Sequence, residues 1–258
     1  MKSRMATMAG VVALGVALGF LSVPPAAAAV AAAAAPAARC TLPVFGPGPS
    51  YHPHIDPSTF TANVTNQFFP LKPGRTLVYQ GTKDGKSAID VVAPSFATLV
   101  VDGVRTRVLE DRLYLNGRLE ERTQDYYAQD ACGDVWYFGE DTAVLDAHGN
   151  VVDTSGSFRA GVDGAQPGVF MTATTMVGRQ FRQEWYVGQA EDTFMAVDPS
   201  TPVTVPYGSF NNALRTKETT ALEPAVVDNK YYVRGIGQVR EIAVKGPLEK
   251  LELVDVIN

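Results

Sequence analysis

Apolar and polar residues alternate in short segments along most of the chain from Arg75 onward. Turn dipeptides separate these segments, and no stretch keeps a helical apolar period over three turns. Such alternation is typical of strands that bury one face. We therefore predict an all-β protein whose strands, about a dozen in number, form a single antiparallel meander. Because a long meander must protect its edges, it is expected to curl into a barrel or half-barrel with a cavity. The later strands are predicted at residues 179–186, 193–197, 203–205, 214–220, 230–234, 238–244 and 248–256.

Three turn motifs predict hairpins. Asp102-Gly103 and Asn116-Gly117 suit two-residue type I′ turns, because both central positions of such a turn need positive φ. His148-Gly149-Asn150 predicts a third, looser hairpin between residues 142–145 and 151–152.

The Asn-Gly turn also predicts a register for its two strands. It pairs Leu115 with Arg118, and an uninterrupted ladder then places opposite charges face to face. The predicted charged pairs are Arg112 with Glu121 and Asp111 with Arg122.

The first residues of the chain have the pattern of a secretory signal peptide. Lys2 and Arg4 precede an apolar stretch at residues 11–21, and prolines and alanines follow it. We predict a signal peptide over 1–30, an Ala/Pro/Gly-rich linker over 31–58 and one β domain over 59–258. The expected location is outside the cell or in the periplasm or envelope. The apolar stretch is too short to span a bilayer, so no stable membrane insertion is expected.

The charge balance narrows the classes of partner. The 258 residues hold 22 Lys+Arg and 27 Asp+Glu, a net charge of −5. Loss of Lys2 and Arg4 with the signal leaves 20 basic residues against 27 acidic ones, a net charge of −7. This acidity disfavours nucleic acid as a partner, since its binding needs a basic face.

Cys40 and Cys132 are the two cysteines of the chain. In an exported protein we expect them to form a disulfide, which would stabilise the fold by roughly 3–5 kcal/mol. Two free thiols are the alternative, because spacing alone does not fix the distance between them.

Consecutive aromatic residues suggest a ligand platform. Trp136, Tyr137 and Phe138 alternate between the two faces of a strand, so neither face is simply solvated. The alternative is core packing, which aromatic side chains dominate. If a pocket is present, we expect the loop at residues 161–168 at its rim. Its predicted ligand-binding residues are Trp136, Phe138, Arg182, Trp185 and Tyr186.

A group of carboxylates supports an enzymatic hypothesis. Two carboxylates across a cleft can serve as acid and base on a glycosidic bond, with Arg182 holding an acidic substrate. The alternative is a set of solvated side chains on strands and turns. No nucleophile elbow, HExxH helix, phosphate-binding loop or CxxC motif is present, and no cofactor is expected. The catalytic candidates are Glu140, Asp141, Asp163, Glu184 and Asp192.

The three histidines give a weaker hypothesis of a metal site. His52 and His54 flank Pro53, which extends the chain and points both rings the same way; Asp56 or His148 would complete the set of ligands. A solvated Pro-rich tail is the alternative.

Several motifs resemble an uncharacterised family of secreted bacterial β-rich proteins. The resemblance covers residues 66–241 and implies a single exported domain without assigning an activity. Residues 231–239, an aromatic pair followed by Gly-x-Gly, are also similar to the closing strands of lipoprotein-carrier-like half-barrels, envelope proteins that hold an acyl chain on a concave sheet. The family motifs are FPLKPG (69–74), YAQD (127–130), VWYFGED (135–141), AGVDGAQPG (160–168), RQE (182–184), AED (190–192), VPYG (205–208) and KYY (230–232).

Three functional hypotheses follow. The first is an exported barrel-like domain that binds a small apolar or amphipathic ligand, or a glycan. The second is a carboxylate-dependent enzyme acting on an extracellular carbohydrate-like substrate. The third is a structural or interaction domain with a filled interior and no pocket.

Overall fold

The computed structural model describes residues 41–258. The predicted signal peptide, residues 31–40 of the predicted linker and Cys40 lie outside the described residues. Both the signal peptide and the Cys40–Cys132 disulfide therefore stay predictions.

Within residues 41–258 the chain forms sixteen strands and two short 3₁₀ helices, which confirms the all-β prediction. The helices are η1 (Gly48–Ser50) and η2 (Pro57–Thr59). The strands are β1 (Phe60–Thr61), β2 (Thr76–Lys83), β3 (Lys86–Val101), β4 (Val104–Leu115), β5 (Arg118–Asp130), β6 (Val135–Leu145), β7 (Val151–Asp153), β8 (Phe158–Arg159), β9 (Gln166–Met171), β10 (Gln180–Arg182), β11 (Glu184–Trp185), β12 (Asp192–Val205), β13 (Gly208–Thr220), β14 (Val227–Val233), β15 (Gly237–Lys245) and β16 (Glu249–Ile257).

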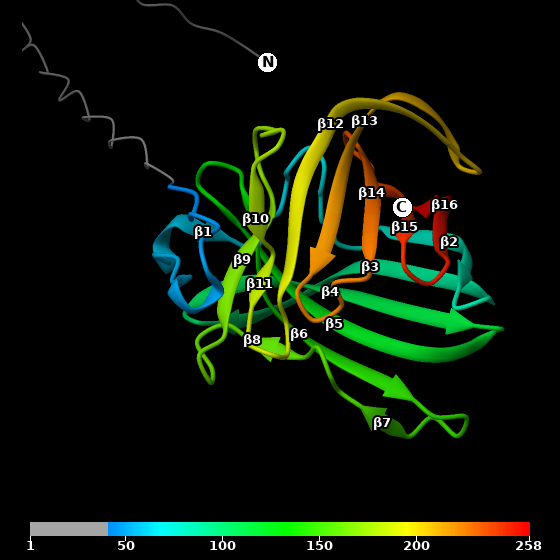
Figure 1. Cartoon of the computed structure of the whole chain (residues 1–258), viewed down its shortest axis with the longest axis horizontal. Coiled ribbons are helices and arrows are strands. Elements are labelled where there is room, and N and C mark those ends of the chain that lie inside the picture. Colours follow the sequence, from blue (N-terminus) through cyan, green and yellow to red (C-terminus); the bar gives the residue numbers. More distant parts are fainter. Residues whose placement is uncertain (1–40) are drawn as a thin grey trace, which may run out of the picture. The chain divides into compact units, whose positions relative to one another are not determined.

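The strands belong to one antiparallel sheet that is nearly closed into a barrel. Along the sheet the order is β10-β12-β13-β14-β15-β16-β2-β3-β4-β5-β6-β9-β11. The two ends of this path, β10 and β11, are separated in sequence by Gln183 alone, so the sheet curls round to its own beginning. In Figure 1, β12 to β14 rise steeply while β3 to β6 cross below them, as expected for a strongly curved sheet.

The predicted hairpins are present. Asp102 and Gly103 have φ of 49° and 76°, and Asn116 and Gly117 have φ of 51° and 79°. Asn and Gly tolerate this left-handed region best, which explains why these dipeptides mark the β3–β4 and β4–β5 turns. The third hairpin joins β6 to β7, with Leu145 paired to Val151.

The predicted charge pairs across β4 and β5 are wrong, although the turn pairs Leu115 with Arg118 as expected. A bulge between Leu113 and Tyr114 shifts the ladder by one residue. Bulges of this kind place two residues of one strand against one of its partner and turn the following side chains over. The observed pairs are Arg112 with Arg122, Leu113 with Glu121, and Asp111 with Thr123.

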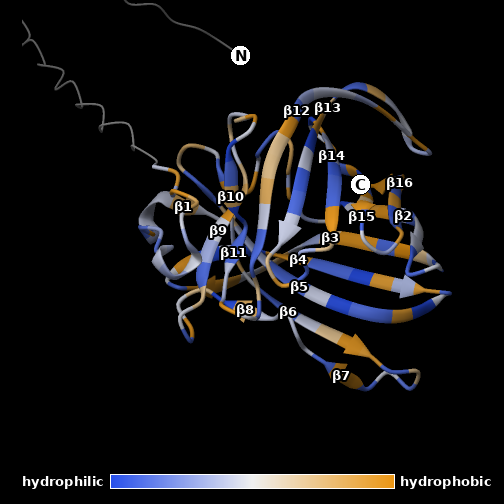
Figure 2. Ribbon diagram, viewed as in Figure 1, coloured by the Kyte–Doolittle hydropathy of each residue, from blue (hydrophilic) through white to orange (hydrophobic). Residues whose placement is uncertain are grey.

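Side chains on the two faces of the sheet have separate surroundings, and Figure 2 shows the alternation of polar and apolar residues along the strands. One core cluster includes Phe68, Tyr127, Tyr137 and Tyr232. A second contains side chains from β2, β4, β15 and β16 together with residues from the curved β12–β13 hairpin: Val203, Val205 and Ala213. These two clusters face the pocket described below.

The third core cluster includes Trp136 and Phe138. Leu42, Ile55 and Phe60, which precede the long strands, pack against it. Trp136 and Phe138 thus share one face of β6, whereas Tyr137 lies on the other, as their alternation predicts.

The segment before β1, predicted as part of a linker, contacts the barrel. Arg182 donates hydrogen bonds to the carbonyl oxygens of Phe45 and Gly46 at 3.3 and 3.0 Å. Its guanidinium lies 4.5 Å from the ring centroids of both Phe45 and Trp185. Tyr51 is buried, and its hydroxyl donates to the carbonyl of Pro167 at 3.2 Å. The composition of this segment does not reveal these contacts, because they depend on side chains more than a hundred residues away.

Candidate functional site

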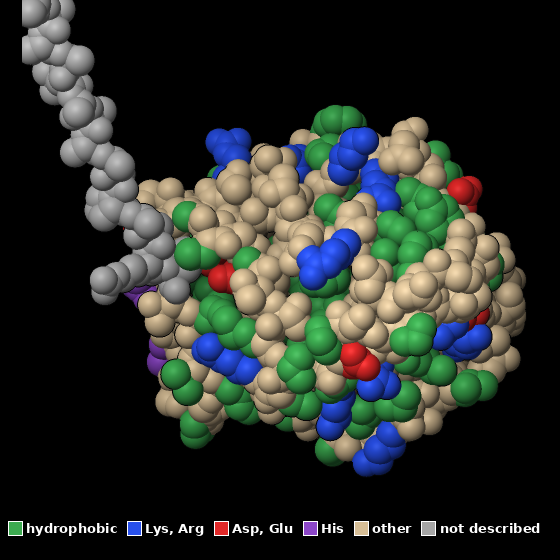
Figure 3. All heavy atoms as spheres, turned by 90° about the horizontal axis from the view of Figure 1, so that it is seen from above, with side chains coloured by type: hydrophobic (Ala, Val, Ile, Leu, Met, Phe, Trp, Pro, Cys, Tyr) green, Lys and Arg blue, Asp and Glu red, His purple; other side chains and the backbone are tan. Residues whose placement is uncertain are grey.

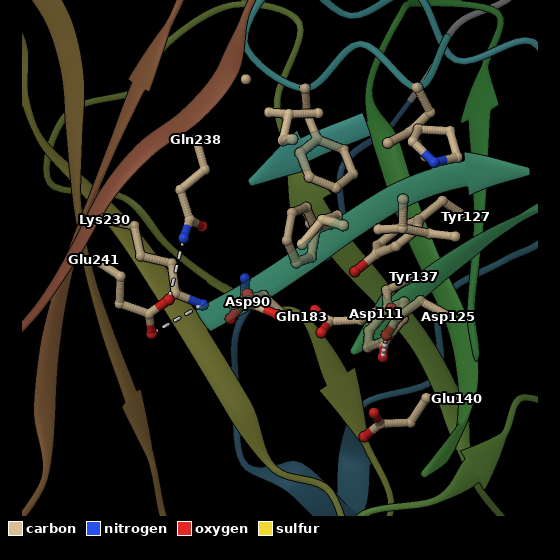
Figure 4. A pocket seen from close by; sticks show the side chains of 18 of the residues that line it. Asp90, Asp111, Asp125, Tyr127, Tyr137, Glu140, Gln183, Lys230, Gln238 and Glu241 are labelled. Carbon is tan, nitrogen blue, oxygen red and sulfur yellow. Dashed lines mark hydrogen bonds and ion pairs between the residues drawn. The ribbon is translucent and has the colours of Figure 1, made fainter. Parts of the chain in front are cut away.

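The inner face of the curved sheet lines a cavity of about 270 Å³ that is partly open to solvent. Figure 4 shows its labelled acidic side chains on several sides of the cavity: Glu241 lies beside Lys230, whereas Asp125 and Glu140 lie on the side of Tyr137. The wall combines an aromatic and aliphatic part with a part rich in carboxyl groups. A cavity with one apolar and one polar region is typical of a site for an amphipathic small molecule.

Eight carboxyl side chains line the cavity, and each comes from a different strand. Lys230 of β14 is the one basic side chain among the lining residues. The carboxyl groups belong to Asp90 (β3), Asp111 (β4), Asp125 (β5), Glu140 (β6), Glu184 (β11), Asp192 (β12), Glu218 (β13) and Glu241 (β15).

The strand periodicity explains why these side chains point inward. Asp111 lies two residues from both Leu109 and Leu113 along β4, so the three side chains point to the same face, which is the inner one. The bulge after Leu113 then places Glu121 on this face, paired with Leu113, and pairs Arg122 with Arg112 instead of Asp111. An unbulged ladder would have placed a basic side chain beside Asp111, so the bulge keeps this side of the interior acidic.

Lys230 is already engaged by two carboxylates. Its Nζ lies 2.9 Å from Oε2 of Glu218 and 3.7 Å from Oε1 of Glu241. Gln238 Nε2 donates to Oε2 of Glu241 at 3.1 Å. Glu218 Oε1 also accepts from Thr216 at 3.2 Å. Desolvation raises the pKa of Glu218, and the neighbouring Lys230 opposes that rise.

Neutral donors serve two carboxyl groups on the opposite wall. The Tyr137 hydroxyl donates to Oδ1 of Asp125 at 2.5 Å, and the Thr142 hydroxyl donates to Oε2 of Glu140 at 2.9 Å. Burial raises the pKa of Asp125 well above its usual range, and the Glu140 charge adds to this. Burial likewise raises the pKa of Glu140 to about 7, while the Thr142 hydrogen bond opposes the rise.

Asp90 and Asp111 lie on adjacent strands, where Asp90 faces Leu113 and Asp111 faces Val92. Burial raises the pKa of both groups, and the Asp111 charge raises that of Asp90 further. Within the described part of the chain, the buried Oδ1 of Asp90 has no hydrogen-bond partner. A buried acceptor without a hydrogen bond lowers the stability of the fold by about 1–3 kcal/mol, so a ligand that donates a hydrogen bond to this oxygen would be bound more tightly.

Glu184 of β11 and Asp192 of β12 complete the acidic wall, close to the two ends of the sheet path. The backbone N–H of Asp192 donates to Oε1 of Glu184 at 3.4 Å. Burial raises the pKa of Glu184 well above its usual range, and the charges of Asp192 and Glu140 add to this. Desolvation also raises the pKa of Asp192.

The apolar part of the cavity is formed by packed aromatic rings. The Phe69 and Phe170 ring centroids are 4.5 Å apart, and the Tyr127 and Tyr137 rings stack at 4.6 Å. The Phe170 ring lies 4.9 Å from that of Tyr127. Such rings offer apolar contact and, through their faces, attraction for a cation.

The predicted ligand-binding aromatic residues lie outside the cavity lining. The Trp136 indole donates to Asp130 at 3.1 Å, and Phe60 packs edge-on against both Trp136 and Phe138. Trp185 covers Gly48 so closely that a Cβ there would lie 1.9 Å from its ring. Trp136 and Phe138 therefore pack in the core, as the alternative to a ligand platform predicted. Tyr137, between them in the sequence, lies on the inner face and lines the cavity.

Tyr186 and Arg182, the other two residues predicted to bind a ligand, contact other parts of the protein and not the cavity. Tyr186 packs, partly buried, against the first core cluster, and its backbone pairs with Ala190. Arg182 holds residues 45–46, as described above, and is not among the cavity-lining residues. The loop at residues 161–168 does not contribute to the lining either.

The structure brings together three of the five predicted catalytic carboxylates. Glu140, Glu184 and Asp192 line the cavity. Asp141, the neighbour of Glu140, points to the other face, where it pairs with Arg159 and accepts from the Tyr126 hydroxyl at 2.8 Å. Asp163 is exposed in a turn with φ of 50°.

The histidines do not enter the cavity. His52, His54 and His148 are exposed. No group of three or more His, Cys, Asp or Glu side chains in the described range is arranged to hold a metal ion. Figure 3 shows one outer face, where Lys and Arg side chains are scattered and few acidic ones are visible.

Sequence reasoning missed five of the eight carboxyl groups and Lys230. One signal was available: each missed residue alternates in phase with inward apolar neighbours. Asp90 lies between Ala88 and Val92, and Glu218 follows Leu214 at a spacing of four. A polar residue in phase with an apolar stripe indicates an inward polar group. The missed carboxyl groups are Asp90, Asp111, Asp125, Glu218 and Glu241.

Comparison with known proteins gives two distant structural similarities. One is to a protein from Bacteroides fragilis described as exported, with a YmcC-like fold; the TM-score is 0.41 and the identity 15%, over 74% of this chain and 99% of that chain. The other is to a protein from Parabacteroides distasonis described as a lipoprotein, with a TM-score of 0.38 and 8% identity over 74% and 99% of the two chains. No family model matches the chain, and no curated protein matches it. In the described part of the chain, no helix is long and apolar enough to cross a membrane.

Proposed function

We propose that this protein is an exported β-barrel domain that binds a small amphipathic molecule in its interior. The observation that carries the proposal is the cavity of about 270 Å³ with an aromatic part and a carboxyl-rich part. A filled structural barrel would have no such space. The predicted signal sequence over residues 1–30 supports export.

The walls of the cavity fit such a ligand because they supply both kinds of contact. Phe69, Tyr127 and Phe170 offer ring faces to an apolar group. Carboxyl groups from eight strands surround the remaining space and fix the orientation of a polar group. Sites of this composition bind through apolar burial and gain specificity from a few placed polar atoms.

An enzymatic function is the second candidate, and Glu140 is the observation that favours it. Its pKa of about 7 suits a general acid or base near neutral pH. Glu184 and Asp192 line the same cavity and are candidates for the second carboxylate. Hydrolysis of a soluble glycoside substrate by the wild type, lost in Glu140→Gln, would support this candidate over simple binding.

A pair of variants on β3 tests binding in the cavity. Val92 lines the cavity, whereas Val91 is its neighbour in the strand and faces the other side. We expect Val92→Phe to fill the space and to weaken binding of the neutral fluorescent dye N-phenyl-1-naphthylamine by about tenfold or more. Val91→Phe adds the same volume outside and should leave binding unchanged.

The dye experiment has a clear negative outcome. If the folded wild type does not bind the dye, or if both variants bind it as well as the wild type, the cavity is not the site. Native mass spectrometry of the secreted wild type gives an independent readout, because a retained organic mass identifies the bound molecule.

A further inference from the structure

We propose that the polar end of the ligand is a positive charge, so that the cavity takes an amphipathic organic ammonium ion. This inference rests on the proposed function, because it concerns the same cavity. It follows from the balance of charged groups on the wall, from an unsatisfied carboxylate oxygen and from the aromatic rings beside it.

The wall holds far more acidic than basic groups. Eight carboxyl side chains line the cavity together with Lys230. Both ion pairs of Lys230 are with Glu218 and Glu241. In residues 41–258, the other six carboxyl groups have no Lys or Arg nitrogen within 4.0 Å. Those six groups are Asp90, Asp111, Asp125, Glu140, Glu184 and Asp192.

Asp90 is the group most in need of a donor. Its buried Oδ1 accepts no hydrogen bond from a donor group in the described range, and a side-chain hydrogen bond links Asp90 to Asp111 when one of the two carries a proton. Asp111 lies beside it on the next strand and carries the same charge when ionised. Burial raises the pKa of both groups, and the Asp111 charge raises that of Asp90 further, so the pair holds protons to a higher pH than free carboxyl groups do. An ammonium group replaces those protons and supplies up to three N–H donors.

The aromatic rings make the cavity suitable for an organic cation. Phe69, Tyr127 and Phe170 present apolar contact for the rest of the ligand, and the face of a ring attracts a nearby positive charge. A bare metal ion would not use these rings, and no metal-binding arrangement exists in the described part of the chain. An anionic head group would meet six carboxyl groups that, within residues 41–258, form no ion pair with Lys or Arg.

Three ligands with the same tail test the charge preference. Hexylammonium, hexanol and hexanoate are titrated into the secreted protein near pH 8 by calorimetry. We expect hexylammonium to bind at least about tenfold more tightly than hexanol, and hexanoate to bind most weakly. Equal binding of hexylammonium and hexanol, or tighter binding of hexanoate, overturns the charge inference but leaves the proposed function standing. Failure of all three to bind overturns both.

A variant and a proton count add independent readouts. Asp90→Asn should lower the affinity for hexylammonium about tenfold and leave that for hexanol unchanged, whereas the exposed control Asp84→Asn should alter neither. Hexylammonium binding to the wild type should also release protons, seen as a binding enthalpy that depends on the buffer. Binding without proton release, or an Asp90→Asn affinity equal to the wild type, contradicts the inference. If the variant does not fold, the proton count still decides.

The proton release belongs to the whole cluster around Asp90 and Asp111. The titratable and charged groups that act on this pair are Tyr79 and Lys83 from β2, Glu121 and Asp125 from β5, Lys230 from β14 and Glu241 from β15. Lys83 and Lys230 favour the ionised pair, and the neighbouring carboxylates disfavour it.

Discussion

The interior carboxyl groups should make the protein less stable as the pH rises, and Glu140→Gln isolates one part of this effect. Glu140 binds its proton more tightly in the folded chain, where its pKa is about 7, than in the unfolded chain, where it is near 4.5. The stability from this group is therefore fully present below pH 4.5 and is lost as the pH rises through about 7.

The size of the effect follows from that difference. One pKa unit corresponds to about 1.4 kcal/mol, so the interval from 4.5 to about 7 corresponds to about 3 kcal/mol of unfolding free energy. Glutamine does not titrate and keeps nearly the same shape. The charge of Glu140 also raises the pKa values of Asp125 and Glu184, so its removal should reduce their pH dependence in the same direction.

Urea unfolding of both proteins at about pH 4 and about pH 8 measures the effect. We expect the wild type to lose about 3 kcal/mol more than Glu140→Gln between these two values. Asp84→Asn, in the exposed turn between β2 and β3, should follow the wild type. If Glu140→Gln and the wild type show the same pH dependence to within about 1 kcal/mol, the argument from burial is wrong.

Three further substitutions test the packing around the cavity. Arg182→Ala should release the segment at residues 42–51, seen as at least about tenfold faster amide hydrogen exchange there while the β3–β4 amides stay protected; unchanged exchange would mean that other contacts hold the segment. Tyr137→Phe removes the 2.5 Å hydrogen bond to Asp125 and should cost about 1–3 kcal/mol in urea unfolding, so a neutral effect would count against that bond. Gly168→Ala places a Cβ 2.3 Å from the carbonyl carbon of Gln183, the residue between β10 and β11, so we expect it to cost about 3 kcal/mol; a fully stable variant would show that this contact is loose enough to accept a methyl group.

Local signals in the sequence were sufficient for the strand character and for the hairpin turns, but not for every strand. Residues 193–197 and 203–205, predicted as two strands, belong to β12, and residues 179–186, predicted as one, form β10 and β11. The alternation of apolar and polar residues predicted the all-β fold, and Asp102-Gly103 and Asn116-Gly117 predicted two hairpins, because few residues tolerate positive φ. These signals act over a few residues, so the distant parts of the chain do not change them.

The prediction from sequence was wrong where a bulge adds one residue to β5 and so reverses the faces on which the following side chains lie. The bulge beside Leu113 reverses Glu121 and Arg122 relative to the unbulged ladder, so the expected charge pairs do not form. A bulge depends on how the whole sheet curves, and the Asn-Gly turn carries no information about it.

The carboxylate site was predictable only in part. Glu140, Glu184 and Asp192 were identified as candidates from the sequence. Whether a carboxyl group such as Asp90 lies inside, or one such as Asp141 outside, depends on which face of its strand turns toward the barrel interior, and the sequence did not reveal this. The same dependence on the inward face places Tyr137 in the cavity wall and its sequence neighbour Trp136 on the opposite face of β6.

The amino-acid sequence by itself determined the strand pattern, the turn positions and the acidic composition, since each depends on residues close together in the chain. Tertiary structure alone decided that carboxyl groups from eight strands meet in one cavity with a single lysine among them. Curvature of the nearly closed sheet brings together carboxyl side chains that are up to about 150 residues apart in the sequence. Burial in that space, and secondarily the charges of neighbouring carboxylates, raise the pKa values of groups such as Asp90, Asp125 and Glu184.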